Sequence, residues 1–103
     1  MIVSLTRVRT GDKPIEDATI VGEEMARWFR DVEGCLGFLM ISREGTTIGL
    51  SFWESREAAV RNQMPRAQFI ERISSVMDVE IAERAEYEVM YAELGPLIAA
   101  TES

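Results

Sequence analysis

Two short apolar segments, separated by only three residues, constrain the fold of this chain more than any other feature. The first spans Cys35–Ser42 and the second spans Thr46–Trp53. Each is bounded by turn-forming residues and has the length of a β-strand rather than that of a helix. Gly45, the last residue of the connection, can take the positive φ that a tight reversal needs. The pattern therefore predicts a β-hairpin.

An amphipathic helix is predicted immediately before the hairpin, from Ile15 to Val32. Pro14 precedes it, and a proline at the start of a helix loses no hydrogen bond because the first N–H groups have no intrahelical acceptor. The apolar residues recur at intervals of three and four, which places them on one side of a helix. They are Ile15, Ala18, Val21, Met25, Phe29 and Val32. Gly34 follows as a residue suited to end the helix.

A second helical region is predicted after the hairpin. Ser55 can cap its start, since its side-chain oxygen can accept from an early backbone N–H. Pro65 lacks an N–H and clashes with the preceding turn, so we expect a break or kink near Met64. The part that follows has apolar side chains at helical spacing, namely Phe69, Ile70, Ile73 and Val76.

The two ends of the chain supply the remaining strands. Ile2–Arg9 is short and rich in β-branched residues. Between Val79 and Leu94 apolar and charged residues alternate. This alternation favours a strand, at least over Ala85–Tyr91. The Glu and Ala content of the segment would also tolerate a helix. We expect one domain over residues 1–94 and a C-terminal tail over residues 95–103.

The element order β-α-β-β-α-β is that of an α+β, ferredoxin-like sandwich. Such a fold has a four-stranded antiparallel sheet with its helices on one face, and the other face is left bare. Phe38, Met40 and Ile48 or their neighbours would lie on that bare face, and the sequence alone leaves open which alternate residues point outward. An exposed apolar sheet face needs a partner, and a second copy is the simplest one. We therefore expect a homodimer through the open sheet face.

Charge and composition exclude several classes of function. Eleven basic residues against eighteen acidic ones give a net charge of −7, which would repel a nucleic acid backbone. No apolar run approaches the roughly 20 residues of a membrane span, and the first residues do not have the pattern of a signal peptide. Cys35 is the only cysteine, so there is no internal disulfide, and the chain contains no histidine. We expect a cytoplasmic protein and no metal site. Without histidine or a second cysteine, a zinc or iron site of the usual nitrogen and sulfur ligands is excluded. Oxygen ligands alone could still hold a metal, but no acidic loop has the spacing of calcium ligands.

Two motifs give the chain a resemblance to the antibiotic biosynthesis monooxygenase family. One is Gly34-x-x-Gly37-Phe38 after the first helix, and the other is Phe52-Trp53-Glu54-Ser55 before the second. The resemblance implies a dimeric α/β barrel, with a pocket in each subunit between the sheet and the two helices. Members of this family include cofactor-free oxygenases of anthrones and quinols, haem-degrading enzymes and many proteins without a known activity.

The resemblance argues against haem degradation. The position that matches Asn62 is a histidine in many members and a tryptophan in haem-degrading ones, which also have an iron-ligating histidine later in the second helix. This chain has no histidine in that region or elsewhere. We therefore expect no cofactor, and the resemblance leaves open whether the chain is catalytic.

Asn62 and Trp53 are the predicted catalytic residues. The Asn62 amide could hold a phenolate or a peroxide-level oxygen, because an amide both donates and accepts hydrogen bonds, and Trp53 could form one wall of an aromatic pocket. The structural alternatives are a capping or solvent-facing Asn62, with Gln63 as the substitute if the register differs by one residue, and a Trp53 in the core.

Five further residues are predicted to contact substrate: Trp28, Met25, Phe69, Tyr87 and Arg7. Arg7 could balance the charge of an enolate, or it could be solvated or paired with a glutamate. Tyr87 could orient substrate if it faces the helices, or lie in the dimer interface if it faces the partner.

The function predicted from the sequence is a cofactor-independent monooxygenase acting on a small phenol, anthrone or quinol. The missing histidine leaves no obvious general base. The alternative is a non-catalytic dimer of the same fold that binds a small apolar or aromatic ligand or has a structural role.

Overall fold

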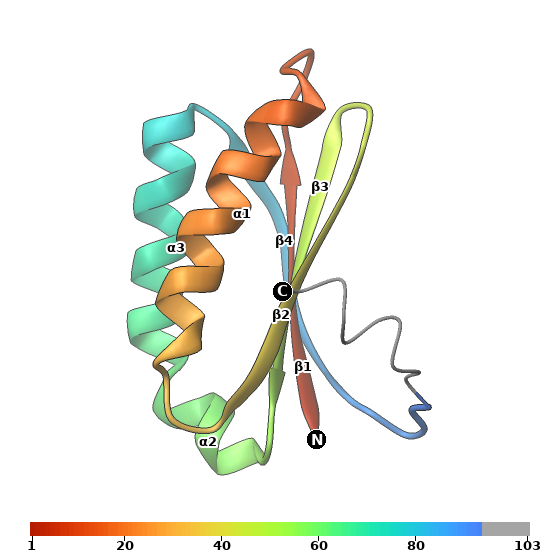
Figure 1. Cartoon of the computed structure of the whole chain (residues 1–103), viewed down its shortest axis with the longest axis vertical. Helices are drawn as coiled ribbons and strands as arrows, with labels where there is room; N and C mark the ends of the chain where they lie inside the picture. Colours follow the sequence, from red (N-terminus) through yellow and green to blue (C-terminus); the bar gives the residue numbers. More distant parts are fainter. Residues whose placement is uncertain (94–103) are drawn as a thin grey trace.

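The computed structural model describes residues 1–93, which form one four-stranded sheet and three helices (Figure 1). Along the chain the elements are β1 (Ile2–Arg9), α1 (Ile15–Arg30), β2 (Cys35–Arg43), β3 (Thr46–Trp53), α2 (Arg56–Arg61), α3 (Gln63–Met77) and β4 (Glu80–Glu88). This order confirms the predicted ferredoxin-like arrangement, with the second helical region divided into α2 and α3. The predicted tail at residues 95–103 lies outside the described residues.

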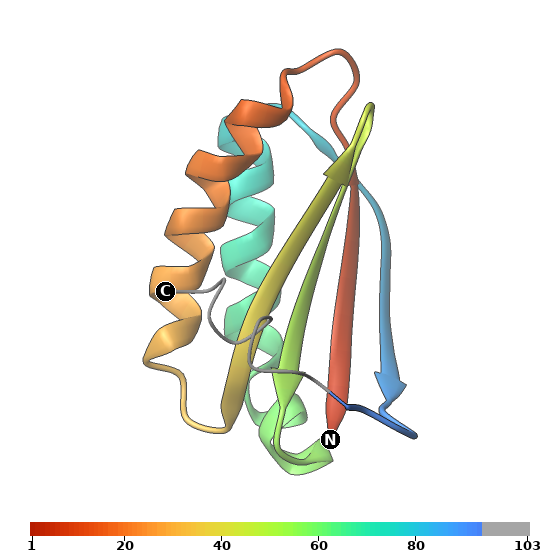
Figure 2. The same cartoon turned by 45° about the vertical axis from the view of Figure 1, so that its right-hand side comes forward.

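The strand order in the sheet is β2-β3-β1-β4, and each neighbouring pair is antiparallel. The helices lie on one face of the sheet, and α1 and α3 run side by side across it (Figure 1 and Figure 2). The other face of the sheet carries no helix. Among the described residues, no helix is long and apolar enough to cross a membrane.

The hairpin turn and the Ser55 cap of α2 form as the sequence predicts. Gly45 has φ +81°, and its carbonyl accepts a hydrogen bond from Thr10 N–H at 3.0 Å, which ties the hairpin turn to the end of β1. Ser55 caps α2, because its hydroxyl accepts from the N–H of Ala58 at 3.1 Å.

The helix boundaries differ from the predicted ones. α1 ends at Arg30, with Asp31 as its C-cap, rather than at Val32. The break in the second region falls at Asn62 rather than near Met64. Pro65 is the third residue of α3, where its missing N–H would have no intrahelical acceptor in any case, so the proline is accommodated inside the first turn.

A β-bulge changes which residues of β4 face the helices. Arg7 pairs with Glu83 and Val8 pairs with Ile81, so Ala82 is the extra residue. Ile81 therefore shares the inner face with Val8, whereas Ala85 and Tyr87 point to the open face, although all three fall on one parity in the sequence. β4 stops at Glu88 rather than at Tyr91, because Glu88 pairs with Ile2, the first residue of β1.

The core lies between the sheet and the helices. Its buried apolar side chains are Ile2, Met25, Phe29, Trp53, Ala58, Ala59, Phe69 and Ile70. Trp53 is completely buried. Its ring contacts Phe29 at a centroid distance of 6.2 Å, and Phe29 stacks on Phe38 at 5.0 Å. The end of the hairpin and α1 are thereby packed against each other through aromatic rings.

The register settles which side chains lie on the open face. Phe38 and Met40 point toward the helices, since Phe38 packs on the core and Met40 contacts α1, whereas Ile48 lies on the open face opposite Ile41. The apolar residues of the open face are Val3, Leu5, Leu39, Ile41, Ile48, Leu50, Phe52, Ala85 and Tyr87. At one end of this face Arg7 pairs with Glu83 at 3.1 Å and Arg9 with Glu80 at 3.0 Å. The open face is thus apolar with a charged end.

Gly34 offers a test of the packing between the start of the hairpin and α2. Its φ is +88°, and a Cβ at this position would lie 2.6 Å from the Cβ of Ala58. Gly34→Ala should lower the free energy of unfolding by about 2–5 kcal/mol, because a left-handed backbone cost adds to an overpacking cost. The measurement is urea denaturation.

The matched control is Gly11→Ala. Gly11 also has a positive φ, +61°, but a Cβ there meets no atom within 4 Å. Only the backbone cost of about 1–2 kcal/mol should appear. Equal losses in the two variants would contradict the predicted contact with Ala58.

Candidate functional site

A cavity lies between the inner face of the sheet and helices α1 and α3. β1 contributes Thr6 and Val8, β2 and β3 contribute Met40 and Gly49, and the remainder comes chiefly from the two helices. The helix residues that line it include Ile15, Ala18, Val21, Met25, Ile70, Ile73, Ser74 and Met77. The cavity has a volume of about 80 Å³. A single water needs about 10–15 Å³ of such space, so a small ligand can enter.

The cavity wall is largely apolar and adaptable. Three methionines, Met25, Met40 and Met77, belong to it. Because a methionine side chain is unbranched and has three rotatable bonds, such a wall can re-form around ligands of different outline. Gly49 on β3 adds no side chain, which leaves space above the sheet. An aromatic or otherwise apolar molecule is the ligand that this wall suits.

Charged groups belong to one end of the cavity. Lys13, Asp17 and Arg43 contribute to its lining, in the region where the loop before α1 meets the turn between α3 and β4. Lys13 Nζ donates a hydrogen bond to the Asp78 carbonyl at 3.0 Å. This bond links the two connections at that end of the cavity.

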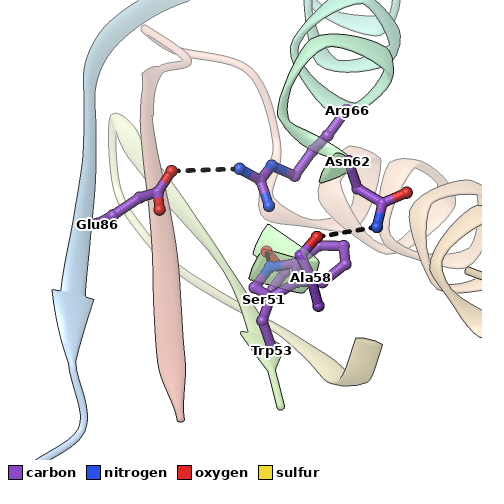
Figure 3. A network of polar contacts seen from close by, with 6 residues as sticks. All are labelled: Ser51, Trp53, Ala58, Asn62, Arg66 and Glu86. Atoms are coloured by element: carbon purple, nitrogen blue, oxygen red, sulfur yellow. Dashed lines mark hydrogen bonds and ion pairs between the residues drawn. The ribbon is translucent and has the colours of Figure 1, made fainter. Parts of the chain in front are cut away.

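A buried arginine lies on the same face of α3 as the cavity-lining residues (Figure 3). Arg66 is 6% exposed. Its guanidinium carbon lies 4.9 Å from the centre of the Trp53 ring, and its Nη2 lies 3.4 Å from Glu86 Oε1 on β4. The Arg66 Nη1 and the Ser4 hydroxyl are buried without a hydrogen-bond partner among the described residues.

Burial has a direct effect on the ionisation of this cluster. It lowers the pKa of the Arg66 guanidinium, and the Glu86 carboxylate acts in the opposite direction. Arginine nevertheless stays protonated at neutral pH, so the site holds a buried positive charge. Burial also raises the pKa of the Cys35 thiol, an effect that the charge of Arg66 partly opposes. Cys35 is therefore a neutral thiol at neutral pH.

Sequence reasoning missed Arg66 because it assigned the inner face of α3 by apolar residues alone. Val76, which it placed on that face, is 79% exposed. The inner face contains Arg66, Phe69, Ile70, Ile73 and Ser74. Arg66 precedes Phe69 by three residues and Ile70 by four, and this spacing is the signal that could have identified it.

The structure places the two predicted catalytic residues at the corner between β3 and α3, outside the cavity wall (Figure 3). Trp53 Nε1 donates to the Ser51 hydroxyl at 2.9 Å. Asn62 Nδ2 donates to the Ala58 carbonyl at 2.9 Å and to the Glu33 carbonyl at 3.4 Å. Both polar side chains thus have structural partners in the protein.

The predicted substrate-contacting residues fall into three groups. Met25 lines the cavity. Trp28 and Phe69 stack on each other at 4.9 Å between α1 and α3. Arg7 and Tyr87 are on the open face of the sheet, where Arg7 is paired with Glu83 and Tyr87 is 54% exposed. The structure therefore does not bring these five residues together.

A second hollow runs between α1 and the edge strand β2. It is lined by residues that include Ala26, Phe29, Leu36 and Phe38, and its volume is about 470 Å³. Its lining is more polar than that of the first cavity, and an apolar ligand gains more from an apolar wall. We therefore take the cavity between the sheet and helices α1 and α3 as the candidate site. Among residues 1–93 there is also no group of three or more His, Cys, Asp or Glu side chains placed to hold a metal ion.

Solved structures share this fold. A Deinococcus radiodurans protein assigned to the antibiotic biosynthesis monooxygenases is 18% identical, with a TM-score of 0.65 over 91% of this chain and 97% of that one. SnoaB from Streptomyces nogalater, a cofactor-independent oxygenase, is 12% identical, with a TM-score of 0.66 over 88% and 94%. A monooxygenase from the gene ActVA-Orf6 of Streptomyces coelicolor, solved with the ligand nanaomycin D, is 18% identical, with a TM-score of 0.65 over 91% of each chain.

No protein-family model matches the chain, and no curated protein matches it. The structural likenesses confirm the ferredoxin-like fold of the single chain, whereas the dimeric barrel stays a prediction. At 12–18% identity they are likenesses of fold.

The hydrogen bonds of Asn62 can be tested by stability. Asn62→Ala should lower the free energy of unfolding by about 0.5–1.5 kcal/mol, the usual net contribution of a hydrogen bond, because the variant loses the bonds that Nδ2 donates to the Ala58 and Glu33 carbonyls. Gln63→Ala is the control, because Gln63 is exposed on the next position and should change stability by no more than about 0.5 kcal/mol. Urea denaturation gives the free energy of unfolding of both variants. If Asn62→Ala unfolds at the same urea concentration as the control, the hydrogen bonds of Asn62 do not contribute to stability.

Proposed function

We propose that this protein is a cofactor-independent monooxygenase that oxidises a small electron-rich aromatic compound, such as a phenol, an anthrone or a quinol. The apolar cavity between the sheet and helices α1 and α3 carries this proposal. The fold shared with SnoaB and with the nanaomycin D complex supports it, since one is a cofactor-independent oxygenase and the other is a monooxygenase that holds a small ligand.

The proposed chemistry needs little from the protein beyond a suitable environment. An electron-rich phenol or anthrone that has lost a proton is itself the reductant of dioxygen. In the anthrone case one oxygen atom becomes the new carbonyl oxygen, and the other leaves as water with the two hydrogens of the oxidised CH₂ group. The cavity would exclude bulk water and hold the substrate anion, and fixed charges stabilise an anion best where water is excluded.

Ala18 gives a means of blocking the cavity without touching the buried polar cluster. It lies on α1 and lines the cavity. Ala18→Leu should fill part of the space, leave the fold intact and reduce oxygen uptake at least tenfold. The measurement is oxygen consumption by purified protein with a panel of anthrones, naphthols and hydroquinones and with no added cofactor.

Thr19→Leu is the matched control, because Thr19 is the next residue of the same helix and is exposed. It adds a similar apolar volume outside the cavity and should keep full activity. Oxygen uptake that is equal in the wild type and in Ala18→Leu would exclude this cavity as the reaction site.

A second candidate function is the storage or sensing of an apolar ligand. The observation that favours it is the composition of the cavity wall, whose one carboxylate, Asp17, belongs to the charged end rather than to the apolar interior. Ligand binding that raises the melting temperature without forming product would favour this function over catalysis.

We also propose that the protein acts as a homodimer through the open sheet face. That face is a continuous apolar surface, with Leu39 at 41%, Ile41 at 48% and Tyr87 at 54% exposure. A stable interface needs about 800 Å² from each partner, which a four-stranded sheet face can supply. A second copy would cover the apolar part, and the pairs Arg7–Glu83 and Arg9–Glu80 would lie toward its edge.

Leu50→Glu should break this dimer. Leu50 lies in the middle of the open face, opposite Leu5 on one side and Leu39 on the other. A charge there would be costly to bury against a second apolar sheet. Sedimentation velocity at micromolar concentration should give twice the mass of one chain for the wild type and one chain mass for the variant.

Ile20→Glu controls for the added charge, since Ile20 is 64% exposed on α1, away from the open face. It should remain dimeric. A wild type that sediments as a monomer would overturn the dimer proposal without affecting the cavity.

A further inference from the structure

The cluster around Arg66 contains more hydrogen-bonding capacity than the protein uses. The guanidinium makes one hydrogen bond, from Nη2 to Glu86 at 3.4 Å, which is long for an ion pair. Its Nη1 is buried and has no partner among residues 1–93, and the same holds for the Ser4 hydroxyl. Both residues are more than nine-tenths buried. Buried polar groups are nearly always hydrogen-bonded, so two unused ones in one cluster call for an explanation.

These two groups face the same small region of the sheet. Ser4 pairs with Ser51 on β3 and with Glu86 on β4. The guanidinium of Arg66 extends from the Trp53 ring on β3 to Glu86 on β4. Because β1 lies between those two strands, and Ser4 is the residue of β1 that pairs with Ser51 and Glu86, the guanidinium and Ser4 belong to the same part of the inner face.

This region lies next to the deep end of the cavity, although Ser4 and Arg66 themselves are not among the residues that line it. On α3, Arg66 lies one turn before the cavity-lining Ile70, which is a rise of about 6 Å. On β1, Ser4 lies two residues before the cavity-lining Thr6, which is about 6.6 Å on the same face. α3 and β1 run in the same direction in Figure 1, so the two polar groups lie beyond the same end of the cavity. The charged lining residues Lys13 and Arg43 belong to the opposite end.

We propose that Arg66 Nη1 and the Ser4 hydroxyl bind the ionised hydroxyl oxygen of the aromatic substrate, so that the substrate is held as its anion at the deep end of the cavity. The substrate O–H bond breaks, the proton passes to water, and the electron pair stays on the oxygen that the two donors hold. No protein base is needed, because the buried cation favours the anion over the neutral phenol. This inference rests on the proposed function of the cavity.

The surroundings of the guanidinium leave it able to take this role. Within residues 1–93, Glu86 on β4 is its one ion-pair partner, and the Cys35 thiol on β2 also acts on it. The Glu86 side chain is 30% exposed and that of Arg66 is 7% exposed, so part of the counter-charge is solvated while the cation is not. An anion brought to Nη1 would therefore meet a positive charge that is incompletely balanced.

Spectroscopic titration of bound 1-naphthol tests the inference, because the naphtholate absorbs at longer wavelength than the neutral form. In the wild type the apparent pKa of the bound naphthol should fall by one unit or more below that of the free compound. Arg66→Met keeps an unbranched apolar side chain without the charge and should remove the shift. Arg66→Lys should retain part of it, and Ser4→Ala should reduce it.

Glu86→Gln should act in the opposite direction, since the guanidinium loses its counter-charge and the pKa of bound naphthol falls further. If the Arg66–Glu86 ion pair had only a structural role, replacing Arg66 and replacing Glu86 would not shift the pKa of bound naphthol in opposite directions. Arg72→Met is the control, because Arg72 is an exposed arginine on the same helix and should leave the shift unchanged. Urea denaturation confirms that each variant is folded.

Naphthol that binds without any change in its pKa would overturn the inference and leave the cavity as a ligand site, with water or a small inorganic anion as the partner of Arg66. An equal shift in the wild type and in Arg66→Met would also overturn it. If neither the naphthol nor any other aromatic compound of the panel binds, the proposed function fails, and this inference fails with it.

Discussion

The complete burial of the Trp53 indole is the constraint on which the rest of the structure depends. An indole N–H without an acceptor would cost about 1–3 kcal/mol in such a place, and the Ser51 hydroxyl two residues earlier provides one at 2.9 Å. The ring contacts Phe29 of α1 on one side and the Arg66 guanidinium of α3 on another. One side chain at the end of β3 therefore fixes both long helices against the sheet. The cap at Ser55 follows two residues later, so the direction in which the chain leaves the sheet is set at the same corner.

This anchoring divides the space between the sheet and the helices into two parts. At one end of β1, Ser4 lies among Ser51, Glu86 and Arg66, and polar groups predominate. Further along the same strand, Thr6 and Val8 face an apolar wall that includes three methionines. Aromatic rings and an arginine occupy the first part, whereas flexible methionines line a cavity in the second. An aromatic compound with one ionisable hydroxyl has the same division, with an apolar body and a polar end.

The parts of the fold that rest on local chemistry could be predicted from the sequence. The hairpin depends on turn residues, the start of α2 on the Ser55 hydroxyl, and the first helix on a repeated apolar spacing. Each forms within two residues of its predicted position. The bulge at Ala82 could not be predicted, because it arises from pairing with β1 and leaves the alternation of β4 unchanged in the sequence. It is the bulge that turns Glu86 toward Arg66. The sequence prediction missed the buried Arg66 for a related reason. The cost of burying its charge is offset by Glu86 on β4 and Trp53 on β3, and no local sequence pattern shows that these residues meet Arg66.

The same compensation explains how a chain without histidine could act on a phenol. A general base removes a proton because its own charge state is tuned near the working pH, and imidazole is the side chain best suited to that task. A buried cation achieves the related result by stabilising the product of ionisation rather than by accepting the proton, and its effect grows as water is excluded. Trp53 keeps the Arg66 guanidinium in place and dry, and Glu86 offsets its charge only in part. In this arrangement the residue that completes the packing at the corner of the fold is also the one that would favour the substrate anion.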